Sequence, residues 1–314
     1  MESKTVIIVA GPTAVGKTAI SLQLAEQFST SIISADSRQC FKELNIGVAK
    51  PAEIDLQRIH HYFINSHSIH EQVTAADFEQ LALGWADEIF RDHNEVIMVG
   101  GTGLYIKAFV EGMDEIPFVP AEIREEIQSQ YSQKGLSWLQ NELSNIDPAY
   151  YAGGEILNPQ RSMRALEVAR ATGRSILSFR STKKKQRSFD ILTIGLQLPM
   201  DQLKQRIDTR VDGMMADGLE EEVRGLTSFR EFNALRTVGY TELFEYFDGK
   251  ISLNEAVEMI KKNTRQYAKR QLTWFRKNPS LIWVEPDLLR LLIDGKKIKD
   301  PGNLRKQIQK IIKS

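Results

Sequence analysis

The 314-residue sequence lacks several features that define whole classes of protein. Its one cysteine, Cys40, excludes an internal disulfide and a cysteine-based zinc cluster. No apolar run approaches the roughly 18 residues that a membrane span needs, so no membrane partner is expected. The N-terminal stretch has neither the apolar core nor the cleavage pattern of a secretory signal. These absences predict a cytoplasmic protein in a reducing compartment.

Net charge is also missing, because 41 Lys and Arg balance 41 Asp and Glu. Overall charge therefore predicts no nucleic-acid partner, and any such partner has to be sought in local clusters. The few histidines, such as His60, His61, His67 and His70, have no cysteine or carboxylate spaced to complete a zinc site, so we interpret them as structural or loop residues.

Short apolar runs alternate with helical patterns along the chain. Runs typical of buried strands occur at 5–10, 31–35, 95–99, 190–198 and 280–284. A helix is predicted over 17–28, and a second of about 17 residues follows a capping box of Thr74 and Asp77. Strands that alternate with helices predict an α/β protein with a parallel sheet flanked by helices. The loops after the strands then share one edge of the sheet.

The length predicts two domains, or one domain with a large insertion. Residues 115–187 show helical patterns and no convincing strand, and prolines mark their start. We therefore expect an all-helical insertion domain at 115–187. The core would be split into a first part at 1–114 and a second part, with C-terminal helices, at 188–314.

A phosphate-binding loop of the pattern G-x-x-x-x-G-K-[ST] follows the first strand. Its glycines let backbone N–H groups surround a phosphate, and the next helix adds its positive N-terminal end. Lysine adds a charge, and the hydroxyl of Thr18 is a ligand for Mg²⁺. The motif predicts a P-loop NTPase-like fold that binds a di- or triphosphate, without saying which. Its residues are Gly11, Pro12, Thr13, Ala14, Val15, Gly16, Lys17 and Thr18.

Two further loops lie at the same predicted edge. Asp36 ends the second strand, and its carboxylate suits a metal ligand or a general base. A helix cap or a salt bridge with Arg38 is an equally good explanation from spacing alone. The glycines of 100–103 allow close approach of a ligand, with Thr102 offering a hydroxyl, although a tight turn explains them as well.

Two stretches are strongly basic. Residues 156–187 carry nine Lys or Arg, Lys183 among them, against one acid, Glu167. Residues 261–277 carry seven against none, with aromatic residues between them. Basic residues interleaved with aromatics suit phosphate tracking and base stacking. A solvated surface is the competing explanation, so the stretches alone leave nucleic-acid binding at even odds.

Together the motifs resemble the tRNA dimethylallyltransferase family (isopentenyl-tRNA transferases) in its bacterial form. The resemblance covers nearly the whole chain, and the matching segments follow in order: 11–18, 36–39, 45–51, 100–105, 160–168, 236–240 and 269–276. Cys40 and Phe41 depart from an aliphatic residue and a tyrosine in many members.

The resemblance implies dimethylallyl transfer from its diphosphate to N6 of the adenosine at position 37, 3′ of the anticodon, by a monomer that uses Mg²⁺. Asp36 would be the general base, with Thr102 and Arg124 beside the reacting centre. The anticodon stem-loop would contact Asp36, Ser37, Arg38, Gln39, Thr102, Arg124, Gln160, Arg161, Ser162, Met163, Arg164, Arg236, Gly239, Tyr240, Lys269, Arg270, Gln271, Thr273, Trp274 and Arg276.

Three other functions are considered beside this one. A P-loop small-molecule kinase would turn over ATP and leave both basic stretches without a role. An isopentenyltransferase acting on free adenine nucleotides would not need a basic insertion. A non-enzymatic RNA-binding protein with a structural nucleotide would tolerate the loss of Asp36.

Overall fold

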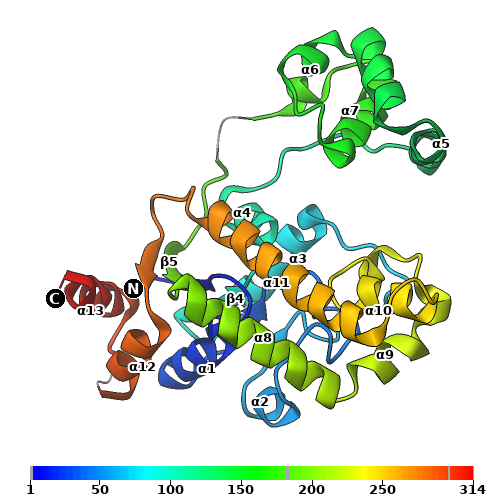
Figure 1. Ribbon diagram of the computed structural model, residues 1–314. Helices are drawn as coiled ribbons and strands as arrows, with labels where there is room; N and C mark the ends of the chain where they lie inside the picture. The colour runs from blue at the N-terminus through cyan, green and yellow to red at the C-terminus, as the bar shows by residue number, and fades with distance from the viewer. Residues whose placement is uncertain (1–2, 182–183, 296–297, 314) are drawn as a thin grey trace. The chain divides into compact units, whose positions relative to one another are not determined.

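Six parallel strands form one sheet in the computed structural model, which describes residues 3–181, 184–295 and 298–313. The order across the sheet is β3-β2-β4-β1-β5-β6, with the first strand near its centre. Strands β4 and β5 are labelled in Figure 1 among the helices that cover the sheet. The strands are β1 Thr5–Ala10, β2 Ile32–Ser34, β3 His61–Tyr62, β4 Glu95–Gly100, β5 Asp190–Leu196 and β6 Ile282–Val284. The predicted α/β fold with a parallel sheet is confirmed.

Strand β1 is buried along its whole length, as its apolar, β-branched sequence requires. Thr5 pairs with Glu95 of β4 on one side and with Asp190 of β5 on the other. Strand β3 was not predicted. It has only two residues, too few to show a strand period, and it is held by pairing with β2 at the sheet edge.

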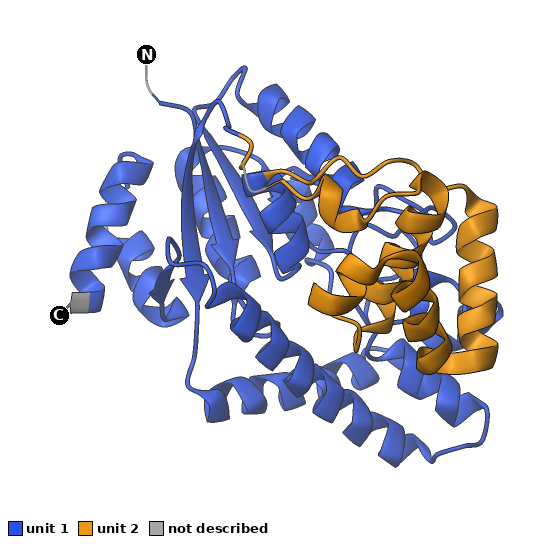
Figure 2. Ribbon diagram, turned by 90° about the horizontal axis from the view of Figure 1, so that it is seen from above, with its two compact units in different colours: residues 1–111, 186–314 blue, residues 112–185 orange. Residues whose placement is uncertain are grey.

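The chain packs as two compact units, Met1–Glu111 with Gln186–Ser314, and Gly112–Lys185 (Figure 2). In the first unit, β1 to β2 and β3 to β4 cross the sheet in opposite directions, so right-handed crossovers put α1 and α3 on opposite faces. The helices of this unit are α1 Lys17–Phe28, α2 Glu53–Arg58, α3 Ala75–Ile89, α4 Gly103–Glu111, α8 Met200–Ala216, α9 Leu219–Gly225, α10 Tyr240–Phe247, α11 Leu253–Phe275, α12 Pro286–Gly295 and α13 Pro301–Lys313.

Apolar side chains explain how these helices hold to the sheet. Ile7 of β1, Ile20 of α1 and Leu289 of α12 belong to one buried cluster. On α3, the predicted capping box is present, because Thr74 Oγ1 accepts from Asp77 N at 3.2 Å and the Asp77 carboxylate accepts from Thr74 N at 2.8 Å. Across 3–181, 184–295 and 298–313, no helix combines the length and apolar character of a membrane span.

In its described residues the second unit contains helices joined by loops and no strand. It consists of α5 Ala121–Ile146, α6 Pro148–Gly153, α7 Pro159–Thr172 and the 3₁₀ helix Ile176–Phe179. Helix α7 begins at a typical start signal. The Asn158 side chain caps it by accepting from Arg161 N at 3.2 Å, and proline follows at the first helical position. It ends at Gly173, whose φ of 67° favours glycine. Buried residues such as Leu139, Tyr150 and Leu166 form a core of its own.

Candidate active site

The phosphate-binding loop joins β1 to α1 and wraps around a lysine. Gly11 has a φ of 151°, and a Cβ there would come within 2.8 Å of the Leu196 carbonyl oxygen, so glycine is required. Gly16, at a φ of 105°, precedes the helix. Lys17 Nζ donates to the Pro12 carbonyl at 2.8 Å, which holds the ammonium group inside the loop. The loop therefore has the shape that a diphosphate or triphosphate needs.

Lys17 is electrostatically unusual. Burial lowers its pKa to about 8, the positive charge of Arg210 acts in the same direction, and the Asp36 carboxylate opposes both. Arg210 comes from α8, and burial lowers its pKa while Asp36 raises it. Sequence reasoning missed this arginine, because α8 also carries aspartates and shows no basic bias. Three charged groups from three separate segments thus interact at the loop.

A pH dependence follows from the lowered pKa of Lys17. Deprotonation removes the charge that faces the phosphate, so kcat/KM for a diphosphate substrate should fall above pH 8 by about tenfold per pH unit. A pH profile from 6 to 9.5 under subsaturating diphosphate measures this. In Lys17→Arg the guanidinium stays charged, and its profile should be flat over that range although activity is lower. The same break in both proteins would contradict the assignment to Lys17.

Of the explanations that its sequence left open for Asp36, the structure shows a cap. Its Oδ1 accepts from Arg38 N at 2.9 Å and from Gln39 N at 3.3 Å, so one oxygen caps the local turn. Within the described part of the chain no hydrogen bond occupies Oδ2, and no salt bridge joins Asp36 to Arg38. The second oxygen is therefore available for chemistry.

The loop after β4 lies against the Asp36 segment. Gly100 approaches the Ala35 carbonyl so closely that a Cβ would come within 2.2 Å of its oxygen. Thr102 Oγ1 accepts from Ser37 N at 3.1 Å, and Thr102 N donates to Ala35 O at 3.2 Å. These contacts bring the Thr102 hydroxyl next to the Asp36 turn, although the two segments are more than 60 residues apart.

Gln271 of α11 connects this loop to the phosphate loop. Its Oε1 accepts from Thr13 N and its Nε2 donates to Gly101 O, both at 2.9 Å. The side chain is 6% exposed. With both ends of its amide occupied, Gln271 acts as a bridge between two loops, and its contact with RNA stays a prediction.

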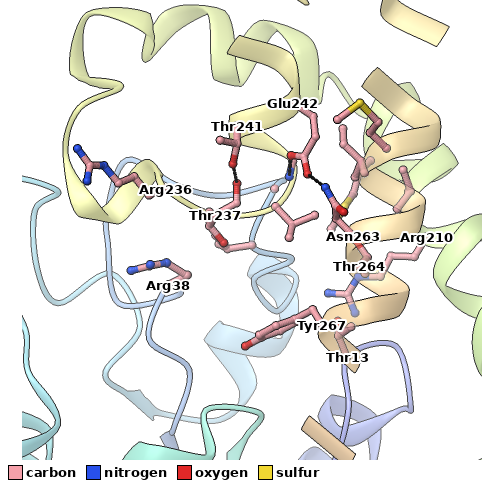
Figure 3. A pocket seen from close by; sticks show the side chains of 18 of the residues that line it. Thr13, Arg38, Arg210, Arg236, Thr237, Thr241, Glu242, Asn263, Thr264 and Tyr267 are labelled. Atoms are coloured by element: carbon pink, nitrogen blue, oxygen red, sulfur yellow. Dashed lines mark hydrogen bonds between the residues drawn. The ribbon is translucent and has the colours of Figure 1, made fainter. Parts of the chain in front are cut away.

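Two neighbouring cavities meet at Asp36. The smaller, about 80 Å³, is lined by Lys17 and Thr18 of the phosphate loop, and the larger, about 570 Å³, opens between α8, α10 and α11 (Figure 3). Five residues line both cavities: Thr13, Asp36, Val48, Arg210 and Tyr267. Figure 3 shows Arg210 and Tyr267 projecting from their helices into the cavity, with Arg38 and Arg236 on the other side of it. A phosphate site and an acceptor-sized space thus share one carboxylate.

The rim of the larger cavity is basic. Arg38, Arg236 and Arg270 line it. Further along α11, a shallow groove of about 380 Å³ is lined by Lys269, Arg270, Thr273 and Trp274. The Trp274 ring packs over Gly103, where a Cβ would come within 2.2 Å of ring Cδ1. Arg276 is exposed beyond it.

Several predicted basic residues are neutralised by acids distant in sequence. On α11, Arg265 pairs with Asp208 at 2.7 Å and Lys261 with Asp212 at 2.8 Å. The basic surface of 261–277 is therefore reduced in its first half, where Lys262 stays exposed, and is densest in its C-terminal half. In the other stretch, Arg187 pairs with Glu79 at 2.9 Å inside the first unit. Lys183 lies outside the described residues.

The second unit holds the remaining predicted residues. Gln160 and Arg161 are exposed at the start of α7. Glu167, 8% exposed, lies 3.0 Å from Arg164 Nη1 and 3.7 Å from Arg124 Nε. One buried carboxylate thus orients two arginines.

Three more predicted RNA contacts are buried. Ser162 is 0%, Met163 4% and Tyr240 0% exposed. Ser162 and Met163 lie on the buried side of α7, next to the exposed Arg161. The Tyr240 hydroxyl donates to Glu222. Their side chains present almost no surface, so RNA contact by these three residues stays a prediction without support from exposure. Residue type and motif membership do not reveal which way a helix turns its side chains.

The parallel sheet and the loop after its central strand define a P-loop-like α/β protein, in which Asp36 lines two adjoining cavities. Comparison with known families is more specific. Residues 39–278 match the model of the IPP transferase family, and the chain belongs to this family.

Curated relatives agree over most of the chain. A tRNA dimethylallyltransferase of Christiangramia forsetii is 48% identical over 285 residues, covering 91% of this chain and 94% of that protein. One of Cytophaga hutchinsonii is 46% identical, covering 90% and 93%.

Solved structures are also similar. The full-length tRNA isopentenylpyrophosphate transferase of Bacillus halodurans is 33% identical, with a TM-score of 0.68 over 100% of both chains. A eukaryotic dimethylallyltransferase acting on tRNA is 25% identical, with a TM-score of 0.76 over 98% of this chain and 85% of that one.

Proposed function

We propose that this protein transfers a dimethylallyl group from dimethylallyl diphosphate to N6 of the adenosine at position 37 of tRNA, directly 3′ of the anticodon. Family membership and the names of relatives across nine-tenths of the chain support tRNA prenylation. One observation carries the residue-level proposal. Asp36 lines both the cavity of the phosphate loop and the larger basic cavity, so it reaches donor and acceptor alike.

The diphosphate is proposed to bind in the smaller cavity. The backbone of Gly11–Thr18 and the N-terminus of α1 provide donors, and Lys17 and Arg210 provide positive charge. Both cations lose solvation on burial, which strengthens their attraction to an anion. This assignment extends the sequence prediction, since Arg210 joins the phosphate loop from α8.

Magnesium fits the donors that are present. Across the described ranges no three His, Cys, Asp or Glu side chains gather to hold a metal. A bound ion would therefore rely on few protein ligands. The Thr18 hydroxyl, at the end of the phosphate loop, is the candidate, and it makes no hydrogen bond within the described residues. Oxygen donors and substrate phosphates are the ligands that Mg²⁺ prefers. When bound, it would neutralise charge on the leaving diphosphate.

The transfer step needs a base and close positioning. The bond from the allylic carbon to the diphosphate oxygen breaks, its electron pair leaves with diphosphate, and the N6 lone pair forms the new carbon–nitrogen bond. The N6 proton passes to Asp36 Oδ2, while Oδ1 keeps the carboxylate oriented through Arg38 N and Gln39 N. Thr102 and Arg124 are proposed beside the reacting centre.

RNA binding is proposed on the exposed basic residues. Arg38, Arg236 and Arg270 line the larger cavity, and the groove beside Trp274 continues from it. An adenine has to leave its stack to enter such a cavity, and positive side chains at the rim suit the flanking phosphates. From the second unit, Gln160, Arg161 and Arg164 are proposed contacts. The proposal also includes a monomer acting in the cytoplasm.

The test uses purified protein, Mg²⁺, labelled dimethylallyl diphosphate and an unmodified anticodon stem-loop with adenosine at position 37. Label is expected in the RNA and should be absent from a stem-loop carrying guanosine there. Free AMP and ATP are offered in parallel. Label in AMP instead would favour the free-nucleotide transferase, and phosphate transfer from ATP without prenylation would favour a kinase.

A further inference from the structure

Glu222 of α9 accepts hydrogen bonds from two separate segments. Its Oε2 accepts from Asn45 N at 3.1 Å and Ile46 N at 2.7 Å, and its Oε1 accepts from Gly47 N at 3.1 Å. The same Oε1 accepts from the Tyr240 hydroxyl at 2.5 Å. Three successive backbone amides that converge on one point form a concave anion site, and here a carboxylate of the chain itself fills it.

The two segments that meet at Glu222 both line the larger cavity, Gly47 and Val48 from one and Gly239, next to Tyr240, from the other. Gly47 packs on the Tyr240 ring so closely that a Cβ would come within 2.5 Å of Cε2. The ring and the carboxylate together hold the two segments against each other, and Glu222 is not among the residues that line the two cavities at Asp36.

The same loop continues to Asp36. Gln39 Nε2 donates to Val48 O at 3.2 Å and to Ala49 O at 3.0 Å, while Gln39 N donates to Asp36 Oδ1. A short path of hydrogen bonds therefore leads from Glu222 through residues 45–49 to the carboxylate proposed as the base.

We propose that Glu222 is a positioning residue for prenyl transfer, which holds loop 45–49 against Tyr240 and so orients Asp36 and the cavity that receives the adenine. This inference rests on the proposed function. The phosphate loop has its own supports, Lys17 to Pro12 and Gln271 to Thr13, and none of them passes through Glu222. Val48 and Ala49 of this loop also line the smaller cavity, but Lys17 and the backbone that would bind the diphosphate keep their own supports. Loss of Glu222 should therefore affect the acceptor side more than the donor side.

The experiment compares Glu222→Gln with Glu221→Gln, which removes an exposed carboxylate from the neighbouring position of α9. Glutamine has one acceptor oxygen. Its NH₂ group would face backbone N–H groups that are also donors, so at least one of these hydrogen bonds would be lost. For Glu222→Gln, kcat should fall by about 10- to 100-fold because the reacting groups are misplaced. KM for the stem-loop should rise, and KM for dimethylallyl diphosphate should stay within about twofold.

Hydrogen exchange on the same samples tests the contact without relying on activity. Peptides covering 43–50 should exchange about tenfold faster in Glu222→Gln than in the control variant. Tyr240→Phe keeps the three hydrogen bonds from backbone amides to Glu222, so its exchange rate over 43–50 should lie between those of the two glutamine variants.

Two failures can be told apart. Wild-type protein that prenylates no RNA would overturn the proposed function and this role with it. An active wild type, with equal kcat and stem-loop KM in the two glutamine variants, would overturn only the positioning role. A loss spread equally over both substrates' KM, with a lower melting temperature, would also overturn it, because that is what general destabilisation produces.

Discussion

Replacing Asp36 by asparagine is expected to lower kcat for prenyl transfer by about 10²- to 10⁴-fold, the usual contribution of a positioned general base. The amide keeps an oxygen where Oδ1 accepts from Arg38 N and Gln39 N, so the turn should survive. What is lost is the basic oxygen that takes the N6 proton. Single-turnover transfer with saturating RNA and diphosphate measures the chemical step directly.

Asp36→Ala serves as the comparison for this prediction. It removes the cap as well as the base, so its melting temperature should fall below that of Asp36→Asn while its kcat is equally low. If Asp36→Asn kept kcat within about twofold of wild type, the carboxylate would be a turn cap alone. The general base would then have to be sought elsewhere in the cavity.

Replacing Arg210 by glutamine should lower kcat/KM for dimethylallyl diphosphate by about 30- to 1,000-fold, since a buried cation facing an anionic ligand is lost. A second consequence concerns Lys17. Because Arg210 lowers the pKa of Lys17, removing it should move the alkaline break of the pH profile from about 8 to a higher pH. Initial rates against diphosphate concentration, at several pH values, measure both effects.

Arg224→Gln is the matched control for Arg210→Gln. Arg224 lies on the neighbouring α9 with its side chain exposed and paired with Glu220. It lines neither cavity at Asp36. Its kinetics should equal those of wild type. An Arg210 variant with a changed KM for RNA and an unchanged KM for diphosphate would contradict the proposed donor role and assign the arginine to the acceptor.

The phosphate loop could be predicted because all its information is contiguous. Strand β1, Gly11, Gly16 and α1 follow each other within 25 residues, and each has a local physical reason for its conformation. Strand β3 could not be predicted, since pairing with β2 defines it and two residues carry no period.

The distribution of surface charge could not be predicted from the sequence. Counting along 261–277 suggested one continuous basic surface, but Asp208 and Asp212 of α8 neutralise Arg265 and Lys261 in its first half. Gln271, assigned to RNA from its motif, turns inward to hold two loops. Both outcomes depend on which helix faces which, and no local pattern contains that information.

The sequence by itself determined the α/β class, the phosphate loop, the capping box at Thr74 and the resemblance that led to the family, because local propensity and short motifs encode them. The tertiary structure alone decided that Arg210 joins Lys17, that Asp36 lies between two cavities, and that Glu222 ties two cavity walls together. The reason is physical: a charge or a hydrogen bond acts over a few ångströms in space, and folding brings together residues that lie up to 271 positions apart in the chain.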